Sequence, residues 1–323
     1  MPKTKHDRPS YEGSASWTKF KALMENRFGH VIELEPEESW FEWRGHQIHL
    51  DSLSPLGPPK GTLVLVHGAG GHGRLLTPLG AVAAEHGWKV LAPDLPGYGL
   101  TITRPKWQAD YQEWPELVAE LAAKEEGPVV LLGMSVGGMT AFRSAQMLPN
   151  LGGVIATNLL DMSDPATFKA AARWPWLGAL SLQVMKFAPW LMDVVPMPLA
   201  LVTPLDAMTS DPQLRTWFKR DPLIGARWVM GRFFRSLHQY VAPQSDLALP
   251  CPLLLIHPGA DEWTPTRVSL RVFDQVSSLK HFQELSNGSH MPAETPAWLE
   301  LREGVLDFLA KIEGNGHVVN EAQ

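Results

Sequence analysis

The chain has 323 residues, of which 45% are hydrophobic and 19% charged, so it can bury a sizeable core and is not disordered as a whole. Its 34 acidic and 28 basic residues give a net charge of −6, which argues against a nucleic-acid-binding protein. The single cysteine, Cys251, excludes both a disulfide scaffold and a cysteine zinc site within one chain.

The sequence lacks a clear secretory or membrane-spanning signal. Residues 1–16 are polar and have no apolar stretch of the kind found in a secretory signal. The most apolar region, residues 174–202, is interrupted by prolines and charges, whereas a membrane-spanning helix needs about 20 consecutive apolar residues. We therefore expect a soluble cytoplasmic protein.

In chain order, the pattern predicts a short helix at 17–28 and then a hairpin formed by residues 39–44 and 47–51. Continuous apolar runs follow, and they are typical of strands buried on both faces. These runs are residues 62–66, 88–92, 129–132, 154–156 and 253–256. Helical stretches lie between the first four of them, at residues 75–86, 114–124 and 138–148. The alternation predicts an α/β fold with a parallel sheet covered by helices.

The alternation stops between residues 158 and 249, a segment rich in Trp, Pro, Met and Phe. We predict that this segment is a helical cap inserted into one α/β core, whose two parts are residues 1–157 and 250–323. After the strand at 253–256, the pattern predicts a helix near 268–276, a strand at 281–285 and a final helix near 298–312.

A G-x-S-x-G motif, residues 133–137, directly follows the predicted strand at 129–132. Such a motif can place Ser135 on a sharp strand-to-helix turn, where close neighbours must lack a Cβ atom. Unpaired N–H groups at the start of the next helix would then suit a developing oxyanion. Taken alone, the motif is a weak signal, because a serine after a tight turn is often only a helix N-cap.

Two further residues strengthen the motif, because Ser135, Asp261 and His290 occur in the chain order of the α/β-hydrolase triad. A serine hydroxyl needs an imidazole base, and the base needs a carboxylate to hold its tautomer. All three are predicted at strand ends on one rim of a parallel sheet, where the sites of such folds lie. Asp161 and Asp164 are weaker alternatives for the acid.

The segment HGAGGHG, residues 67–73, follows the strand at 62–66. We predict that the backbone N–H groups of Ala69 and Val136 form the oxyanion hole, with Gly70 as the alternative to Ala69. The same segment contains G-x-G-x-x-G, and Asp94 ends the next strand, so a dinucleotide-binding oxidoreductase is a distant alternative. His67 is expected to stabilise its loop, His72 to lie at the pocket edge and Asp94 to brace its own loop.

Five motifs together resemble the α/β-hydrolase superfamily: HGAGGHG at 67–73, DLPGYG at 94–99, GMSVGG at 133–138, GADEWTP at 259–265 and GSHMPAE at 288–294. The first is similar to the loop of monoacylglycerol lipase-like and lysophospholipase-like serine hydrolases. The resemblance implies a mostly parallel, eight-stranded sheet flanked by helices, with an inserted helical cap. It also implies a lipase-like serine esterase that needs no cofactor or metal.

By this resemblance, Ser135 is the nucleophile, His290 the base and Asp261 the acid, with Ala69 and Val136 in the oxyanion hole. The sequence departs from many relatives at Met134, where they have His, and at Val136, where they have Met. A serine nucleophile argues against epoxide hydrolase and haloalkane dehalogenase activity, because those enzymes form their ester intermediate on a carboxylate.

The apolar cap favours a small-molecule substrate with an acyl or alkyl chain. We predict that Trp176, Met185, Trp190 and Trp263 line the substrate pocket, and that Tyr98 and Arg74 are further pocket candidates. A separate hypothesis is that the cap makes peripheral contact with membranes. The predicted reaction is hydrolysis of a carboxylic ester through an acyl-enzyme. Amidase, lactonase, acyltransferase and carbon–carbon bond hydrolase activities stay open, because they use the same triad.

Overall fold

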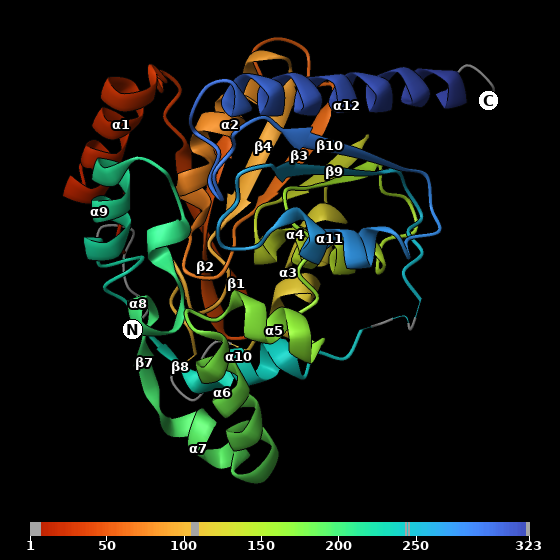
Figure 1. The fold of residues 1–323 in the computed structure, drawn as a ribbon. Helices are drawn as coiled ribbons and strands as arrows, with labels where there is room; N and C mark the ends of the chain where they lie inside the picture. Colours follow the sequence, from red (N-terminus) through yellow and green to blue (C-terminus); the bar gives the residue numbers. More distant parts are fainter. Residues whose placement is uncertain (1–7, 105–109, 243, 245, 321–323) are drawn as a thin grey trace.

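The computed structural model describes residues 8–104, 110–242, 244 and 246–320, and its centre is an eight-stranded sheet (Figure 1). The strand order is β1-β2-β4-β3-β5-β6-β9-β10. The first two strands form the predicted antiparallel hairpin, β2 runs antiparallel to β4, and all other pairs are parallel. The strands are Glu37–Trp43, His46–Leu53, Gly61–Val66, Trp88–Pro93, Val129–Gly133, Gly153–Ala156, Leu253–Pro258 and Lys280–Leu285. The predicted mostly parallel eight-stranded sheet is confirmed.

Alternate residues of the central strands pack against helices on opposite faces of the sheet. In β3, Leu63 and Leu65 face one helix layer, whereas Val64 and Val66 face the other. The first layer consists of α2 (Thr77–Glu85) and α12 (Ala297–Asn320). The second layer consists of α3 (Glu113–Ala122), α4 (Val136–Ala145) and α11 (Thr266–Phe273). This double burial explains why the strands read as continuous apolar runs.

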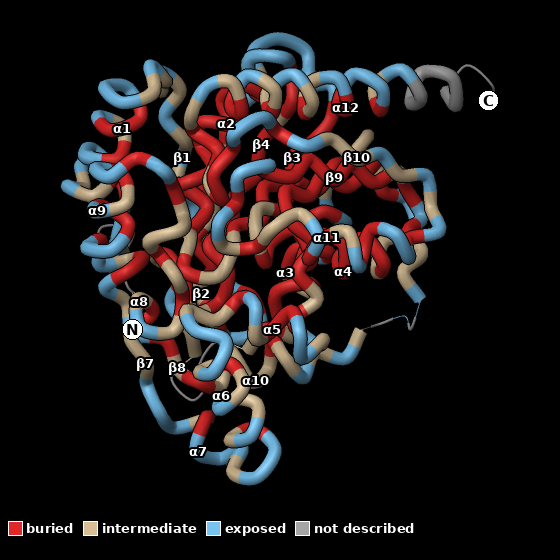
Figure 2. Tube along the Cα trace, viewed as in Figure 1, coloured by how far each residue is buried: buried red, intermediate tan, exposed pale blue. Residues whose placement is uncertain are grey.

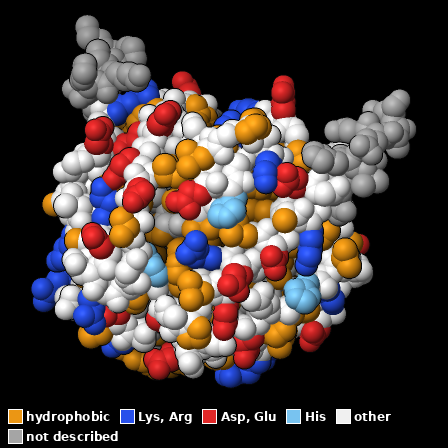
Figure 3. Space-filling model, turned by 90° about the horizontal axis from the view of Figure 1, so that it is seen from above, with side chains coloured by type: hydrophobic (Ala, Val, Ile, Leu, Met, Phe, Trp, Pro, Cys, Tyr) orange, Lys and Arg blue, Asp and Glu red, His pale blue; other side chains and the backbone are white. Residues whose placement is uncertain are grey.

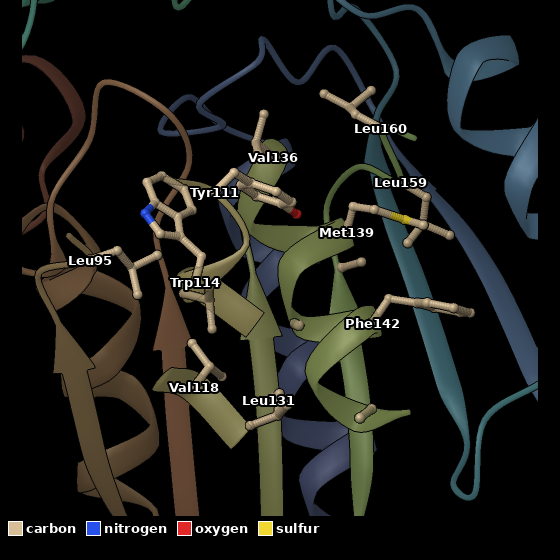
Figure 4. Close-up of a cluster of buried hydrophobic side chains, with 14 of the residues drawn as sticks. Leu95, Tyr111, Trp114, Val118, Leu131, Val136, Met139, Phe142, Leu159 and Leu160 are labelled. Atoms are coloured by element: carbon tan, nitrogen blue, oxygen red, sulfur yellow. The ribbon is translucent and has the colours of Figure 1, made fainter. Parts of the chain in front are cut away.

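Figure 4 shows the core between the sheet and the second helix layer. Trp114 and Val118 of α3 and Phe142 of α4 pack beside Leu131 of β5, and all four are buried. Burying side chains of this size stabilises the fold by roughly 1.5–3 kcal/mol each. The cluster continues upward to Val136, the first residue of α4, so the core supports the turn that precedes this helix.

Between β6 and β9 the chain forms mostly helices, of which α5, α6, α7 and α10 lie beyond one end of the sheet (Figure 1). They are α5 (Pro165–Ala171), α6 (Pro175–Phe187), α7 (Pro189–Val194), α8 (Leu199–Val202), the 3₁₀ turn η3 (Leu205–Ala207), α9 (Pro212–Arg220) and α10 (Gly231–His238). Four of these helices begin with a proline, which lacks the N–H that a first turn cannot use. The expected helical character of this segment is present.

Two features of this segment differ from the sequence-based expectation. A short antiparallel pair, β7 (Pro196–Pro198) and β8 (Trp228–Met230), was not predicted, because three-residue strands leave no readable pattern. In addition, α9 packs against α1 (Ala15–Phe28) near the N-terminus, with the rings of Phe20 and Trp217 5.1 Å apart.

Burial decreases away from the sheet, and most residues of α6 and α7 are exposed or only partly buried (Figure 2). Within the described ranges, no helix has both the length and the apolar character needed to cross a membrane. On the face seen in Figure 3, acidic and basic side chains are interspersed with hydrophobic ones.

Candidate active site

Ser135 lies on the turn between β5 and α4, with the backbone angles φ 57° and ψ −128°. A positive φ is rare for a residue with a Cβ atom and is held here by close packing. A Cβ on Gly133 would lie 2.0 Å from the carbonyl oxygen of Gly137, and one on Gly137 would lie 2.2 Å from that of Val66. Both flanking glycines of the motif are therefore required by the turn.

The turn brings Ser135 next to His290, which follows β10, and Asp261, which follows β9. The Ser135 hydroxyl donates to His290 Nε2 across 2.9 Å, and His290 Nδ1 donates to Asp261 Oδ2 across 2.7 Å. Ser135 is partly exposed, whereas the other two residues are buried. This arrangement can remove a proton from the hydroxyl and stabilise the resulting imidazolium.

Asp261 is held as a carboxylate by its surroundings. Its Oδ1 accepts the backbone N–H groups of Trp263 and Thr264 across 2.8 and 2.9 Å. Burial alone would raise the pKa of Asp261, but the charge and hydrogen bond of His290 and the hydrogen bonds of Thr264 lower this pKa to about 2. The ring of Trp263 also packs against His290, with 4.5 Å between the ring centroids.

Sequence reasoning missed a buried polar pair, Thr157 and Asn158, directly after β6. The Ser135 N–H donates to Thr157 Oγ1 across 3.2 Å, and the Thr157 hydroxyl donates to Asn158 Oδ1 across 2.8 Å. Asn158 Nδ2 in turn lies 3.2 Å from Asp261 Oδ2. A continuous chain of hydrogen bonds thus joins the serine turn to the acid loop. The available signal was two polar residues at the end of a buried strand.

The HGAGGHG loop packs directly against the serine turn. A Cβ on Gly68 would lie 2.9 Å from the Cβ of Ser135, and Gly70 has a φ of 88° that favours glycine. Among the described residues, neither the Ala69 N–H nor the Val136 N–H has a hydrogen-bond acceptor. The loop and the start of α4 therefore each offer a backbone N–H group without an acceptor near Ser135.

His67 holds this loop in place, as the sequence indicated, because its Nδ1 donates to the Gly68 carbonyl and its Nε2 accepts the Leu95 N–H. Asp94 holds the two loops together, since its carboxylate accepts the N–H groups of Gly73 and Leu100 across 2.7 and 2.8 Å. Asp94 is fully buried and engaged in this way, so it is not placed to bind a ribose. The dinucleotide-binding alternative is therefore not supported.

A buried charge cluster lies behind the loop, at the hairpin edge of the sheet. Arg74 pairs with Asp51 and Glu38, and His49 contacts Glu38 and Asp94 at 3.1 Å each. Glu38, His49 and Asp51 are close enough together to hold a metal ion. The negative charges of Glu38 and Asp51 are, however, already balanced by Arg74 and by His49, whose pKa is raised to about 9.

Two apolar cavities meet at Ser135, and both are also lined by Ala69 and Trp263. Cavity 1 extends along the HGAGGHG loop toward η3 and α9, and it includes His290, Leu205, Met208, Phe218, Ile224 and Met291. Cavity 2 extends into the inserted helices, and it includes Phe168, Leu177, Ser181, Met192, Met197 and Leu237. Each cavity has a volume of about 60 Å³.

Several predicted pocket residues lie elsewhere. Of the four, only Trp263 lines a cavity, whereas Trp176 and Trp190 are 62% and 67% exposed on α6 and α7 and Met185 is buried in the core. Successive residues on a helix point about 100° apart, so α6 turns Leu177 and Ser181 inward and Trp176 outward.

The remaining candidates also have other roles. Tyr98 is buried in the core and Arg74 is paired with Asp51, so neither lines the cavities. Of the alternative acids, Asp161 accepts hydrogen bonds from Ser163, and Asp164 caps α5. His72 lines cavity 1, and Cys251 is buried, which raises the pKa of its thiol to about 12.

Comparison with known proteins agrees with this geometry. Residues 57–294 match the family model of serine aminopeptidase S33. The chain is 26% identical over 259 residues to a monoacylglycerol lipase of Mycolicibacterium smegmatis, with 77% of this chain and 87% of that protein covered. It is 36% identical over 107 residues to a pimeloyl-[acyl-carrier protein] methyl ester esterase of Xanthomonas oryzae, with 33% and 38% covered. The crystal structure of Paleococcus ferrophilus monoacylglycerol lipase superposes with a TM-score of 0.63 at 22% identity, with 82% and 99% covered.

Proposed function

The chain belongs to the serine aminopeptidase S33 family and is a lipase-like serine hydrolase that acts on esters, and we propose that Ser135, His290 and Asp261 carry out this hydrolysis. The observation that carries the proposal is the unbroken hydrogen-bonded chain from the Ser135 hydroxyl through His290 to Asp261. The substrate is a small carboxylic ester with an apolar acyl chain, because apolar side chains line both cavities at Ser135.

The reaction proceeds through an acyl-enzyme. Ser135 Oγ attacks the ester carbonyl carbon while its proton moves to His290 Nε2, and Asp261 stabilises the imidazolium. The N–H groups of Ala69 and Val136 stabilise the oxyanion. Collapse of the tetrahedral intermediate releases the alcohol, and a water molecule, activated by His290, then hydrolyses the acyl-enzyme by the same steps.

Ester hydrolysis is favoured over amide, lactone or carbon–carbon bond cleavage and over acyl transfer, because the relatives reported above include a lipase and a methyl ester esterase. The decisive experiment combines a fluorophosphonate probe with p-nitrophenyl esters of increasing chain length. Wild type and the exposed-serine control Ser163→Ala should be labelled and active, and Ser135→Ala should be neither. Labelling of Ser135→Ala would reject the proposed nucleophile, and labelled wild type without ester turnover would reject ester hydrolysis.

We further propose that residues 158–249 form a cap between two parts of one core, 1–157 and 250–323, and that the protein works in the cytoplasm. The helices of this segment provide one wall of cavity 2. Its outer side exposes Trp176, Phe187 and Trp190 at 62%, 75% and 67%, a surface suited to peripheral membrane contact.

Liposome co-sedimentation tests the membrane contact. The doubly substituted Trp176→Ser/Trp190→Ser should bind liposomes much more weakly than wild type, because two exposed aromatic anchors are removed. Leu279→Ser is the matched control, since Leu279 is 76% exposed outside the cap. Equal binding of all three proteins, or no binding of wild type, would contradict the contact.

A further inference from the structure

The two cavities differ in their relation to His290. Both share Ser135, Ala69 and Trp263, so an ester carbonyl at Ser135 would send one substituent into each cavity. Among the described residues, His290 lines cavity 1 and is absent from the lining of cavity 2. Because His290 Nε2 lies 2.9 Å from Ser135 Oγ, it faces the reacting carbon from the side of cavity 1.

The chemistry of the first step determines which part of the ester must lie on the side of His290. The Oγ–C bond forms as the Ser135 proton moves to His290 Nε2, and the carbonyl electrons move onto the oxyanion. The bond from carbon to the alcohol oxygen then breaks, and that oxygen takes the proton from His290 Nε2. The leaving oxygen must therefore lie on the side of His290, and the acyl chain must lie on the other side.

We propose that cavity 1 binds the leaving alcohol, that cavity 2 binds the acyl chain, and that the substrate is an uncharged ester with an apolar alkyl or aryl group on the alcohol side as well. This assignment rests on the proposed function and specifies its substrate class. It excludes leaving groups that are rich in hydroxyls or carry charge.

The lining of cavity 1 supports an apolar alcohol. Leu205, Met208, Phe218 and Ile224 line it on the side of the inserted segment, and no Asp, Glu, Lys or Arg of the described residues lines it. A hydroxyl or a charged group placed there would lose its hydration without gaining a partner. An alkyl or aryl group would instead gain from burial in proportion to its area.

Besides Ser135 and His290, the polar side chains that line this cavity are His72 and His67, and neither offers a partner to a polar group there. Both ring nitrogens of His72 lack a hydrogen-bond partner within the described part of the chain, but each is fully buried and so is not open to a hydroxyl in the cavity. The ring stacks on Tyr11, with 4.8 Å between the ring centroids. Burial lowers the pKa of His72 to about 3, so the ring is neutral at physiological pH. The other histidine at the loop, His67, already uses both nitrogens.

Two esters of equal shape test the assignment on wild-type protein. They are 2-methylbutyl hexanoate and 2,3-dihydroxypropyl hexanoate, which differ only by methyl groups in place of hydroxyls on the alcohol. We expect kcat/KM to be at least tenfold higher for the 2-methylbutyl ester, because each hydroxyl would be buried without a partner. An equal or higher kcat/KM for the dihydroxypropyl ester would overturn the proposal.

Two matched substitutions test which cavity holds which group. Met208→Trp narrows cavity 1 and Ser181→Trp narrows cavity 2, and both positions are partly exposed. For esters of one acid, Met208→Trp should lower kcat/KM at least tenfold more for the hexyl ester than for the methyl ester. For esters of one alcohol, Ser181→Trp should lower kcat/KM at least tenfold more for the hexanoate than for the acetate. The reverse pattern would overturn the assignment.

The result is separable from the proposed function. Loss of fluorophosphonate labelling in Ser135→Ala tests the nucleophile, whatever the substrate preference. Wild type that is labelled at Ser135 and prefers the dihydroxypropyl ester would leave the hydrolase intact and reject the apolar alcohol cavity.

Discussion

Asn158 Nδ2 lies 3.2 Å from Asp261 Oδ2, so the second residue after β6 directly contacts the carboxylate that is hydrogen-bonded to His290. Asn158 is fully buried and also contacts Thr264 and His257, each at 3.1 Å. It is thereby held in one orientation, and its amide donates to the same oxygen that accepts the His290 N–H. Asn158 is thus a positioning residue for the acid.

Replacing Asn158 should therefore impair the chemical step more than substrate binding. We expect Asn158→Leu to lower kcat by roughly 10- to 100-fold, the effect of losing a hydrogen bond to a charged group, with little change in KM. Asn150→Leu is the control, because Asn150 is exposed. Steady-state kinetics and thermal unfolding of both variants distinguish a positioning role of Asn158 from a purely structural one. An unchanged kcat in a folded Asn158→Leu would rule out the positioning role.

The choice of acid can be tested by two isosteric substitutions. Asp261→Asn should lower kcat by about 10⁴-fold, because the amide cannot hold His290 in the required tautomer. Asp161→Asn should change kcat less than about threefold, since its carboxylate contacts Ser163 and Arg143 rather than His290. Kinetics with one p-nitrophenyl ester measure both values, and a larger loss in Asp161→Asn would overturn the assignment.

At Gly70 the HGAGGHG loop lies close against Leu199 of α8. A Cβ on Gly70 would lie 2.5 Å from Leu199 Cδ2, and the φ of 88° adds backbone strain. We expect Gly70→Ala to lower kcat at least tenfold by displacing the adjacent Ala69 N–H. The double variant Gly70→Ala/Leu199→Ala should recover part of this loss, because only the steric contact is relieved. Absence of any recovery would argue against the contact as the cause.

The buried His49 makes stability depend on pH. Burial alone would lower its pKa, but the pairing of His49 with Asp94 and Glu38 and the charges of Asp94 and Asp51 raise it to about 9, above the unfolded value of about 6.5. A raised folded pKa means that the stabilisation is complete below about pH 6.5 and is lost as pH rises through about 9.

Urea unfolding at pH 6.5 and pH 10 measures this effect. As pH rises from 6.5 to 10, the loss of the His49 contribution should lower the wild-type free energy of unfolding by up to roughly 3 kcal/mol. His49→Gln should show a smaller fall, because its side chain does not titrate. An equal fall in both proteins would show that other groups are responsible.

The sequence by itself determined the sheet and the order of the site residues. Apolar runs such as residues 62–66 record burial on both faces, and Gly133 and Gly137 are required wherever such a turn exists. Ser135, Asp261 and His290 each follow a predicted strand, and the carboxyl ends of parallel strands share one rim. These features are local or depend only on strand order, so they are readable without coordinates.

Only the tertiary structure decided which side chains reach the reacting centre from the inserted segment. Trp176 and Leu177 are neighbours in an apolar stretch, yet only Leu177 lines cavity 2. Likewise, nothing local indicates that Asn158 meets Asp261, because they are 103 positions apart. The rotation of a helix and the approach of distant loops are set by packing between elements, and the free energy of that packing depends on contacts that no single segment contains.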